Sequence, residues 1–173
     1  GGGLIGTACA LSLSGLGSKV SIIEKQTKKN IISKKADTRT VAISEGTKKI
    51  FQNLDIWHEI ERFAEPIKRI KIIDRKLFNS IDFDNKRRNS NLGYIVENNK
   101  LLDILYRNIY KKNNICFFNN STIKNISNTS EKIITTINNT KIISDLNIAA
   151  DGKNSFVRSF YKATMFKKNY NKK

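Results

Sequence analysis

Apolar residues recur with two periods along the chain, one typical of helices and the other of strands. Residues 4–16 and 98–110 have helical spacing, and the second segment places four apolar residues on one side (Leu101, Leu102, Leu105 and Ile109). Short apolar runs at residues 19–24, 115–118 and 146–150 are typical of strands. Strands and helices therefore alternate, which favours an α/β fold with a parallel sheet.

A second helical region follows an extended segment at residues 37–44. Ser44 is a good N-cap residue for a helix that starts at residue 45. Residues 45–64 carry an apolar stripe of Ile50, Leu54, Trp57, Ile60 and Phe63. Residues 53–55 are a candidate break into two helices, and Pro66 is predicted to end the region.

Two further regions are predicted to be antiparallel. Residues 67–84 alternate between apolar and polar positions on both sides of a turn at residues 74–76, so we expect a β-hairpin. Three short strands at residues 122–126, 132–137 and 141–143 are separated by turns rich in Asn, Ser and Thr. They predict an antiparallel meander inserted into the α/β fold.

The start of the chain has the spacing of a dinucleotide-binding turn. Gly1, Gly3 and Gly6 precede the first helix, and Glu24 follows Gly6 after seventeen intervening residues, at the end of the next predicted strand. Gly1 would permit the tight turn, Gly3 would let a pyrophosphate approach the backbone, and Gly6 would let the helix pack on the sheet. Glu24 would accept hydrogen bonds from a ribose. Asp37 is an alternative acidic residue for the ribose, with a poorer spacing.

A second segment that could bind a ligand follows the last predicted strand. There Asp151 and Gly152 precede a helical turn that contains Ser155, Val157 and Arg158. Ligands of open parallel sheets bind where strands end, and Asp151 is predicted to lie at such an end. The alternative is an ordinary Asp-Gly turn with a solvated Arg158.

The formal net charge of +17 raises the question of nucleic acid or an anionic membrane as partner. Lysines outnumber arginines about three to one and are scattered over loops and helix surfaces, and no nucleic-acid motif accompanies them. The abundance of Ile, Lys and Asn, which share A/T-rich codons, accounts for much of the basic character. We therefore expect no specific nucleic-acid binding and a weak, salt-sensitive attraction to acidic lipid.

The two cysteines, Cys9 and Cys116, lie in apolar surroundings and are predicted to be buried thiols of a reducing compartment. No C-x-x-C motif or Cys/His cluster is present, so we expect no metal site. No apolar run is long enough to predict a membrane-spanning helix.

These segments together resemble the flavoprotein aromatic hydroxylases, and among them the ubiquinone-biosynthesis hydroxylases, the 2-polyprenyl-6-methoxyphenol hydroxylase-like family. The resemblance is carried, in the same order, by the opening glycines with their acidic residue, by residues 37–44 and by residues 150–158. Residues 94–98, with Leu101 and Leu105, are similar to the stretch before the long cofactor-side helix of that family.

The resemblance implies a Rossmann-like FAD-binding domain with a parallel sheet, an antiparallel meander and a partial substrate-domain hairpin. The cofactor would be FAD, with NAD(P)H as reductant, and no residue of this chain would be catalytic. The glycines would hold the FAD pyrophosphate, Glu24 the adenosine ribose, and Arg39 would lie near the phosphates. Asp151 would orient the cofactor, and Arg158 would fix its own loop and meet the nicotinamide cofactor. The implied cofactor-binding residues are Gly1, Gly3, Gly6, Glu24, Arg39, Asn98, Asp151, Gly152 and Arg158.

The implied reaction is a monooxygenation in ubiquinone biosynthesis. NAD(P)H reduces the flavin, which activates O₂, and one oxygen atom is transferred to the ring of a polyprenylated phenol. The protein positions the ring and excludes water. Because such a substrate is lipid-soluble, we expect a cytoplasmic protein with peripheral contact to the inner face of a membrane.

In domain terms, residues 1–164 would form an incomplete FAD-binding domain, residues 66–96 a partial substrate-domain insert, and residues 165–173 a basic tail. The chain contains no Gly-Asp dipeptide, which the family carries after its Asp-Gly motif, and no strand precedes Gly1. We therefore expect a chain truncated at both ends, a fragment or the product of a split or decaying gene, that alone neither holds FAD tightly nor hydroxylates. Whether a companion polypeptide supplies the missing half is left open by the sequence.

Two other interpretations remain open. One is an NAD-dependent Rossmann oxidoreductase, although neither Tyr106 nor Tyr110 has the Lys four residues later that many such enzymes carry. The other is a non-enzymatic basic remnant.

Overall fold

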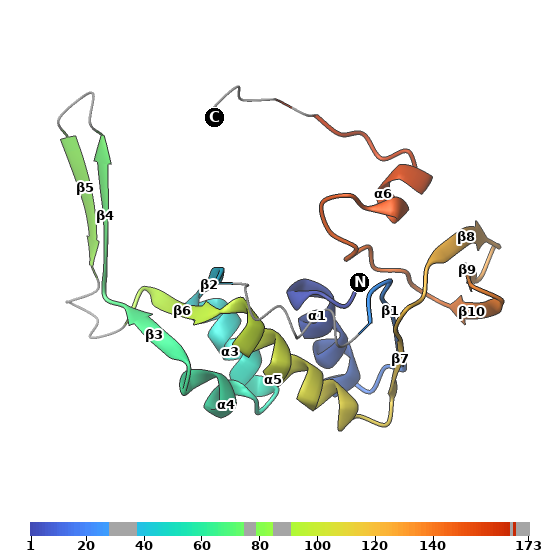
Figure 1. Cartoon of the computed structure of the whole chain (residues 1–173), viewed down its shortest axis with the longest axis horizontal. Coiled ribbons are helices and arrows are strands. Elements are labelled where there is room, and N and C mark those ends of the chain that lie inside the picture. The colour runs from blue at the N-terminus through green and yellow to red at the C-terminus, as the bar shows by residue number, and fades with distance from the viewer. Residues whose placement is uncertain (28–37, 75–78, 85–90, 167, 169–173) are drawn as a thin grey trace.

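Two short strands that are distant in the sequence pair in parallel. The structure, a computed structural model, describes residues 1–27, 38–74, 79–84, 91–166 and 168. Strand β1 (Val20–Ile23) pairs with β7 (Ile115–Phe118) over its whole length. Helices α1 (Leu4–Gly15) and α5 (Asn98–Tyr110) lie side by side next to this pair (Figure 1). The predicted α/β fold with parallel pairing is confirmed, and within the described residues the parallel sheet has two strands.

A separate antiparallel sheet follows α1 and β1 in the chain. Its strands are β2 (Thr40–Ile43), β6 (Gly93–Glu97) and β3 (Ala64–Ile67), in the order β2-β6-β3. Pro66 lies inside β3 and does not end the region as predicted. A proline is tolerated there because, within the described part of the chain, β3 is an edge strand with β6 as its one neighbour.

Helices α3 (Glu45–Asn53) and α4 (Trp57–Glu61) connect β2 to β3. The predicted cap is confirmed, since the Ser44 hydroxyl accepts a hydrogen bond from the backbone amide of Thr47. The predicted break is confirmed as well, and Asp55 in the break has a positive φ of 57°.

The predicted hairpin projects away from the rest of the molecule (Figure 1). Its strands are β4 (Arg69–Asp74) and β5 (Asn79–Asp84), and residues 75 and 76 of the predicted turn lie outside the described residues. Ile70 pairs with Phe83 and Ile72 with Ile81, so these four side chains share one face of the hairpin. Their exposed fractions range from 42% to 58%, so this apolar face is largely uncovered.

The predicted meander is confirmed. Strands β8 (Ile123–Asn128), β9 (Ile133–Ile137) and β10 (Thr140–Ser144) form an antiparallel sheet in the order β10-β9-β8. The short helix α6 (Phe156–Phe160) follows, and Ser155 caps its N-terminus.

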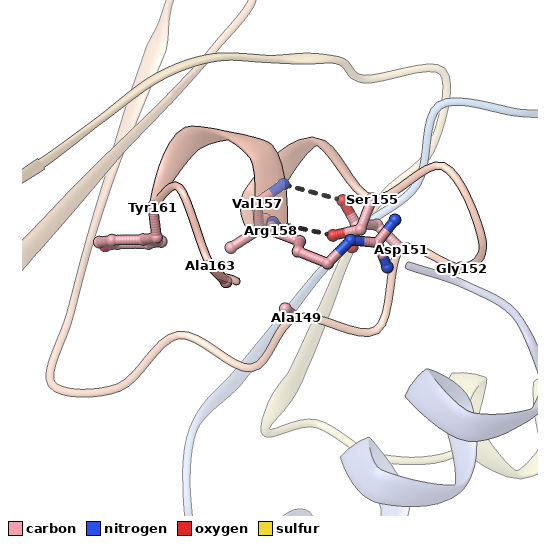
Figure 2. Close-up of a pocket in the computed structure, with 8 residues that line it drawn as sticks. All are labelled: Ala149, Asp151, Gly152, Ser155, Val157, Arg158, Tyr161 and Ala163. Carbon is pink, nitrogen blue, oxygen red and sulfur yellow. Dashed lines mark hydrogen bonds between the residues drawn. The ribbon is translucent and has the colours of Figure 1, made fainter. Parts of the chain in front are cut away.

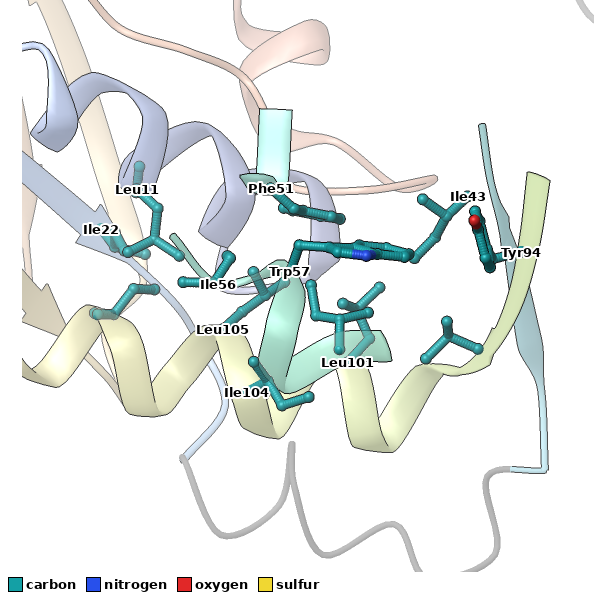
Figure 3. Packing of buried hydrophobic residues seen from close by; sticks show 14 residues of the cluster. Leu11, Ile22, Ile43, Phe51, Ile56, Trp57, Tyr94, Leu101, Ile104 and Leu105 are labelled. Carbon is teal, nitrogen blue, oxygen red and sulfur yellow. The ribbon is translucent and has the colours of Figure 1, made fainter. Parts of the chain in front are cut away.

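The hydrophobic core joins α1, α3, α4 and α5 to the strands β1, β2 and β6 (Figure 3). Ile60 and Leu105 are fully buried. Trp57 packs edge-on against Tyr94, with 5.0 Å between the ring centroids. Helix α5 therefore contacts both the parallel pair and the antiparallel sheet.

Three further sequence predictions are wrong. Residues 146–150 form no strand, because a strand needs a hydrogen-bonded neighbour and no described strand pairs with them. In the apolar stripe of residues 45–64, Ile50 and Phe63 are about half exposed, while Phe51 and Ile56 are buried. The break at residue 55 ends the helical periodicity on which that stripe was based.

The third error concerns the cysteines. Cys116 is exposed, and Cys9 is only partly buried. Side chains alternate across strand β7, so Ile115 and Phe117 pack against the core while Cys116 points to the opposite face.

Candidate dinucleotide-binding site

Helix α1 starts without a side-chain cap. Gly3 is its N-cap residue, in extended conformation (φ −76°, ψ −179°), and it offers no side-chain cap to the amides of the first turn. The first intrahelical bond from the backbone joins the Thr7 amide to the Gly3 carbonyl, at 3.0 Å. The amides of residues 4–6 therefore lack intrahelical acceptors, and the first turn carries no acidic residue. Such a helix end attracts an anionic group such as a phosphate.

The three glycines of the fingerprint have different surroundings. A Cβ atom at Gly6 would lie 1.9 Å from the Gly1 carbonyl oxygen, and one at Gly1 would lie 2.1 Å from the Ala150 carbonyl oxygen. A Cβ atom at Gly3 would meet nothing within 4 Å. Gly6 is thus required because a Cβ atom there would clash with the turn itself, and not, as predicted, because the helix packs on the sheet there. Gly1 is required because the segment before Asp151 passes next to it. The space at Gly3 is open to a ligand.

Glu24 lies directly after β1, beside the glycine turn. One carboxylate oxygen, Oε2, accepts a hydrogen bond from the Gly2 amide at 2.7 Å, and the other, Oε1, accepts one from the Gln26 amide at 2.9 Å. Each carboxylate oxygen can accept a further bond, so the group can still receive a ribose hydroxyl. Asp37, the alternative acidic residue, lies outside the described residues.

Asp151 and Gly152 reach the same turn from the other end of the chain. Gly152 has φ +82°, a conformation that favours glycine. Asp151 Oδ2 accepts a hydrogen bond from the Val157 amide at 3.2 Å, while Oδ1 is buried without a partner in the described part of the chain. Buried polar atoms in proteins normally have a partner, so this oxygen fits an acceptor for a bound ligand.

The ionisation of Asp151 follows from its contacts. Burial by itself would raise the pKa of Asp151, but hydrogen bonds from the Ser155 hydroxyl and from nearby backbone amides hold it below its usual value of 3.8. Asp151 is therefore a carboxylate at neutral pH, suited to accept hydrogen bonds and not to donate a proton.

A pocket of about 390 Å³ lies beside this loop (Figure 2). Its lining comprises Ala149, Asp151, Gly152, Ser155, Val157, Arg158, Tyr161 and Ala163. Arg158 Nη2 donates to the Lys153 carbonyl at 2.6 Å, and the Arg158 amide donates to Ser155 Oγ at 3.0 Å. Arg158 thereby ties the two ends of its loop together, and its contact with a nicotinamide cofactor stays a prediction.

The structure also brings Arg39 and Asn98 together. The Asn98 amide donates to the Arg39 carbonyl at 3.0 Å, which joins the residue before β2 to the first residue of α5. The side-chain oxygen of Asn98 is buried and has no partner among the described residues. An α-helix rises about 1.5 Å per residue, so Asn98 lies about 12 Å along α5 from Tyr106. Tyr106 in turn contacts the glycine turn.

Tyr106 is a site residue that the sequence did not indicate. Its side chain is fully buried, and its hydroxyl donates to the Gly2 carbonyl at 2.9 Å. The available signal was a tyrosine on the apolar stripe of a helix, since a buried tyrosine hydroxyl usually needs a partner. That signal does not say which backbone group the partner would be.

Within the described ranges, no group of three or more His, Cys, Asp or Glu side chains could hold a metal ion. None of the helices in the same ranges combines the length and the apolar character that a bilayer crossing needs.

Comparisons with known proteins agree with this geometry. The family described as "FAD binding domain" matches residues 1–171. The ubiquinone biosynthesis monooxygenase COQ6 of Dictyostelium discoideum is 26% identical over 198 aligned residues, covering 100% of this chain and 40% of that protein. The ubiquinone hydroxylase UbiM of Neisseria meningitidis is 24% identical over 165 residues, covering 91% of this chain and 36% of that protein. The resemblance to the ubiquinone-biosynthesis hydroxylases is confirmed.

Solved structures share the fold. The flavin-dependent monooxygenase PieE, crystallised with FAD and substrate, superposes with a TM-score of 0.70 and 17% identity, covering 94% of this chain and 31% of that one. The chain spans about two-fifths of the length of the curated relatives that it matches. The alternative of an NAD-dependent oxidoreductase receives no support from these matches.

Proposed function

Because the chain belongs to the FAD binding domain family, which matches residues 1–171, we propose that its glycine turn binds the ADP half of FAD. The observation that carries this proposal is the open space at Gly3 in front of an uncapped helix N-terminus. The amides of residues 4–6 would hold the pyrophosphate, and the Glu24 carboxylate would accept the adenosine ribose hydroxyls.

The remaining predicted residues extend this site. Asp151 would accept a hydrogen bond through its unpartnered Oδ1, with the positive φ of Gly152 shaping the turn beside it. Arg39 would lie near the phosphates, and Asn98 would offer its buried side-chain oxygen to the same cofactor. Arg158 would meet NAD(P)H, the reductant, beside the pocket that it lines.

The reaction proposed is hydroxylation of a polyprenylated phenol in ubiquinone biosynthesis, with O₂ as oxidant and peripheral contact to the inner face of a membrane. FAD, when bound, supplies the redox chemistry and the activation of O₂. This chain's share is to hold and orient the cofactor. The chain spans about two-fifths of the length of these relatives, so the complete reaction is a proposal for it.

The domain assignment is part of the same proposal. Residues 1–164 would form the FAD-binding domain, residues 66–96 an insert that faces the substrate, and residues 165–173 a basic tail. The uncovered apolar face of the β4–β5 hairpin supports a role of that insert next to an apolar substrate or further protein.

Substituting Gly3 by Ala tests the proposal. The added methyl group would enter the space left for the pyrophosphate, so we expect the affinity for ADP to fall at least about tenfold. Because that methyl group meets no protein atom, the free energy of unfolding should change by less than about 1 kcal/mol. Isothermal titration with ADP and FAD, together with urea unfolding, measures both quantities.

Gly46→Ala is the matched control, since a Cβ atom there lies 3.8 Å from Ser44 Oγ, an ordinary contact in helix α3. This variant should bind ADP like the wild type. A Gly3→Ala variant with unchanged ADP affinity would contradict the placement of the phosphates.

A further inference from the structure

Gly2 is held at both of its backbone polar groups by side chains from distant elements. Its amide donates to Glu24 Oε2 at 2.7 Å, and its carbonyl accepts from the Tyr106 hydroxyl at 2.9 Å. The first contact comes from the end of β1, and the second comes from α5, 104 residues along the chain. The orientation of the peptide between Gly2 and Gly3 is therefore set by tertiary contacts.

The direction of the Gly3 amide follows from planar geometry. In a trans peptide the carbonyl of one residue and the N–H of the next point in opposite directions. The Gly2 carbonyl points inward to the buried Tyr106 hydroxyl, so the Gly3 N–H points outward. Gly3 is exposed, and the space at its Cβ position is open.

We propose that Tyr106 is a positioning residue: its hydroxyl turns the Gly2–Gly3 peptide so that the Gly3 N–H faces the phosphates of the bound dinucleotide. This inference rests on the proposed function, to which it adds a residue that touches no cofactor atom itself. The donor to the phosphate is the backbone of Gly3, and Tyr106 determines where that donor points.

The surroundings of Tyr106 suit this role. Its ring packs edge-on against Phe117, with the centroids 5.3 Å apart, so the ring is held independently of the hydroxyl. Burial, and to a smaller extent the Glu24 carboxylate, raise the pKa of Tyr106, so the hydroxyl remains a donor at neutral pH. A Cβ atom at Gly2 would lie 2.5 Å from this hydroxyl oxygen, so the contact also accounts for the glycine at position 2.

The test compares Tyr106→Phe with Tyr110→Phe. The first substitution keeps the aromatic packing and removes only the hydroxyl, whereas Tyr110 lies one turn further along α5 and is half exposed. We expect Tyr106→Phe to weaken ADP binding about threefold to tenfold, the equivalent of one hydrogen bond. Adenosine, which has no phosphate, should bind equally to wild type and both variants in ligand-observed NMR titrations.

The ratio of ADP to adenosine affinity separates positioning from general stability. A purely structural loss would weaken both ligands in parallel and would overturn the inference, as would a Tyr106→Phe variant with unchanged ADP affinity. A wild-type chain that binds neither ADP nor FAD would overturn the proposed function, and the inference with it.

A second measurement needs no variant. In the wild-type protein, the Gly3 amide resonance should shift on addition of ADP and stay in place on addition of adenosine. A Gly3 resonance that ADP leaves unmoved would overturn the inference even if Tyr106→Phe fails to fold.

Discussion

Each glycine of the turn at residues 1–6 meets a different constraint. Gly6 and Gly1 face backbone carbonyl oxygens at distances that no Cβ atom could keep, whereas Gly3 faces open space. The first two are therefore needed for the fold, whereas the space at the third would be filled by the cofactor under the proposed function. The sequence motif alone does not make this distinction, because it records only the spacing of the glycines.

Gly6→Ala should destabilise the protein in the absence of any ligand. The methyl group would lie 1.9 Å from the Gly1 carbonyl oxygen, so the turn must shift. We expect the free energy of unfolding to fall by about 1–3 kcal/mol, the usual cost of overpacking. Urea denaturation, with Gly46→Ala as control, measures it, and equal midpoints for the two variants would contradict the clash.

Asp151→Asn should show a stability loss that depends on pH. The pKa of Asp151 in the folded protein lies below its usual value of 3.8, so the ionised form stabilises the fold. That contribution is fully present above pH 3.8 and is lost as the pH falls through the lower, folded pKa. The difference in unfolding free energy between wild type and variant should thus be largest near neutral pH and shrink below about pH 4.

Urea unfolding at several pH values between about 7 and about 3 measures that difference. Asp55→Asn, at a carboxylate that is 99% exposed, controls for the loss of one negative charge. A difference between wild type and Asp151→Asn that stays constant over this pH range would argue against an ionised, hydrogen-bonded Asp151.

The contacts of Glu24 and Tyr106 mark how far site residues could be predicted. Glu24 is predictable from the sequence because one helix and one strand of ordinary length separate it from the glycines, which gives a fixed spacing. Tyr106 was not, because its contact with Gly2 spans 104 residues and depends on how α5 packs against α1. Local patterns predict residues that lie near the turn in the sequence. Which distant side chains contact the turn is determined by tertiary packing.

At the scale of elements, local periodicity predicted the helices and hairpins well. Helix α5 has the bounds predicted for it, and the β8–β9–β10 meander has the predicted order. The errors concern segments whose state depends on distant neighbours. Residues 146–150 have the apolar composition of a strand but no described strand beside them, and Cys116 is exposed because its face of β7 is not covered.

The exposed apolar face of the β4–β5 hairpin should contribute little to the stability of the fold. Replacing Ile72 and Ile81 together by Thr should leave the urea midpoint nearly unchanged, because the two side chains are 53% and 58% exposed. The same change should reduce the binding of a hydrophobic dye and the tendency to aggregate, since it removes apolar surface from an uncovered face.

Ile104→Thr is the matched control for that pair, since Ile104 is 1% exposed in the core. It should lower the free energy of unfolding by about 2 kcal/mol or more. If the hairpin double variant unfolded as readily as Ile104→Thr, the apolar face of the hairpin would have to be covered in solution.

At the scale of the whole molecule, the net charge of +17 is expected to attract the protein to anionic surfaces. We expect co-sedimentation with vesicles that contain anionic phospholipid at low ionic strength, and release at about 0.5 M salt, where the Debye length is only a few ångströms. Vesicles of neutral phosphatidylcholine are the control. Binding that salt does not reduce would indicate apolar insertion in place of charge attraction.

The contacts of the glycine turn also determine when this turn can fold during synthesis of the chain. Gly2 needs Tyr106, and Gly1 packs against Ala150, so the turn cannot take its final form until residues far downstream have left the ribosome. At about 5–20 residues per second, roughly eight to thirty seconds separate the synthesis of residue 1 from that of residue 150. For that time the glycine turn cannot form these contacts, so we expect this segment of the nascent chain to be accessible to chaperones and proteases.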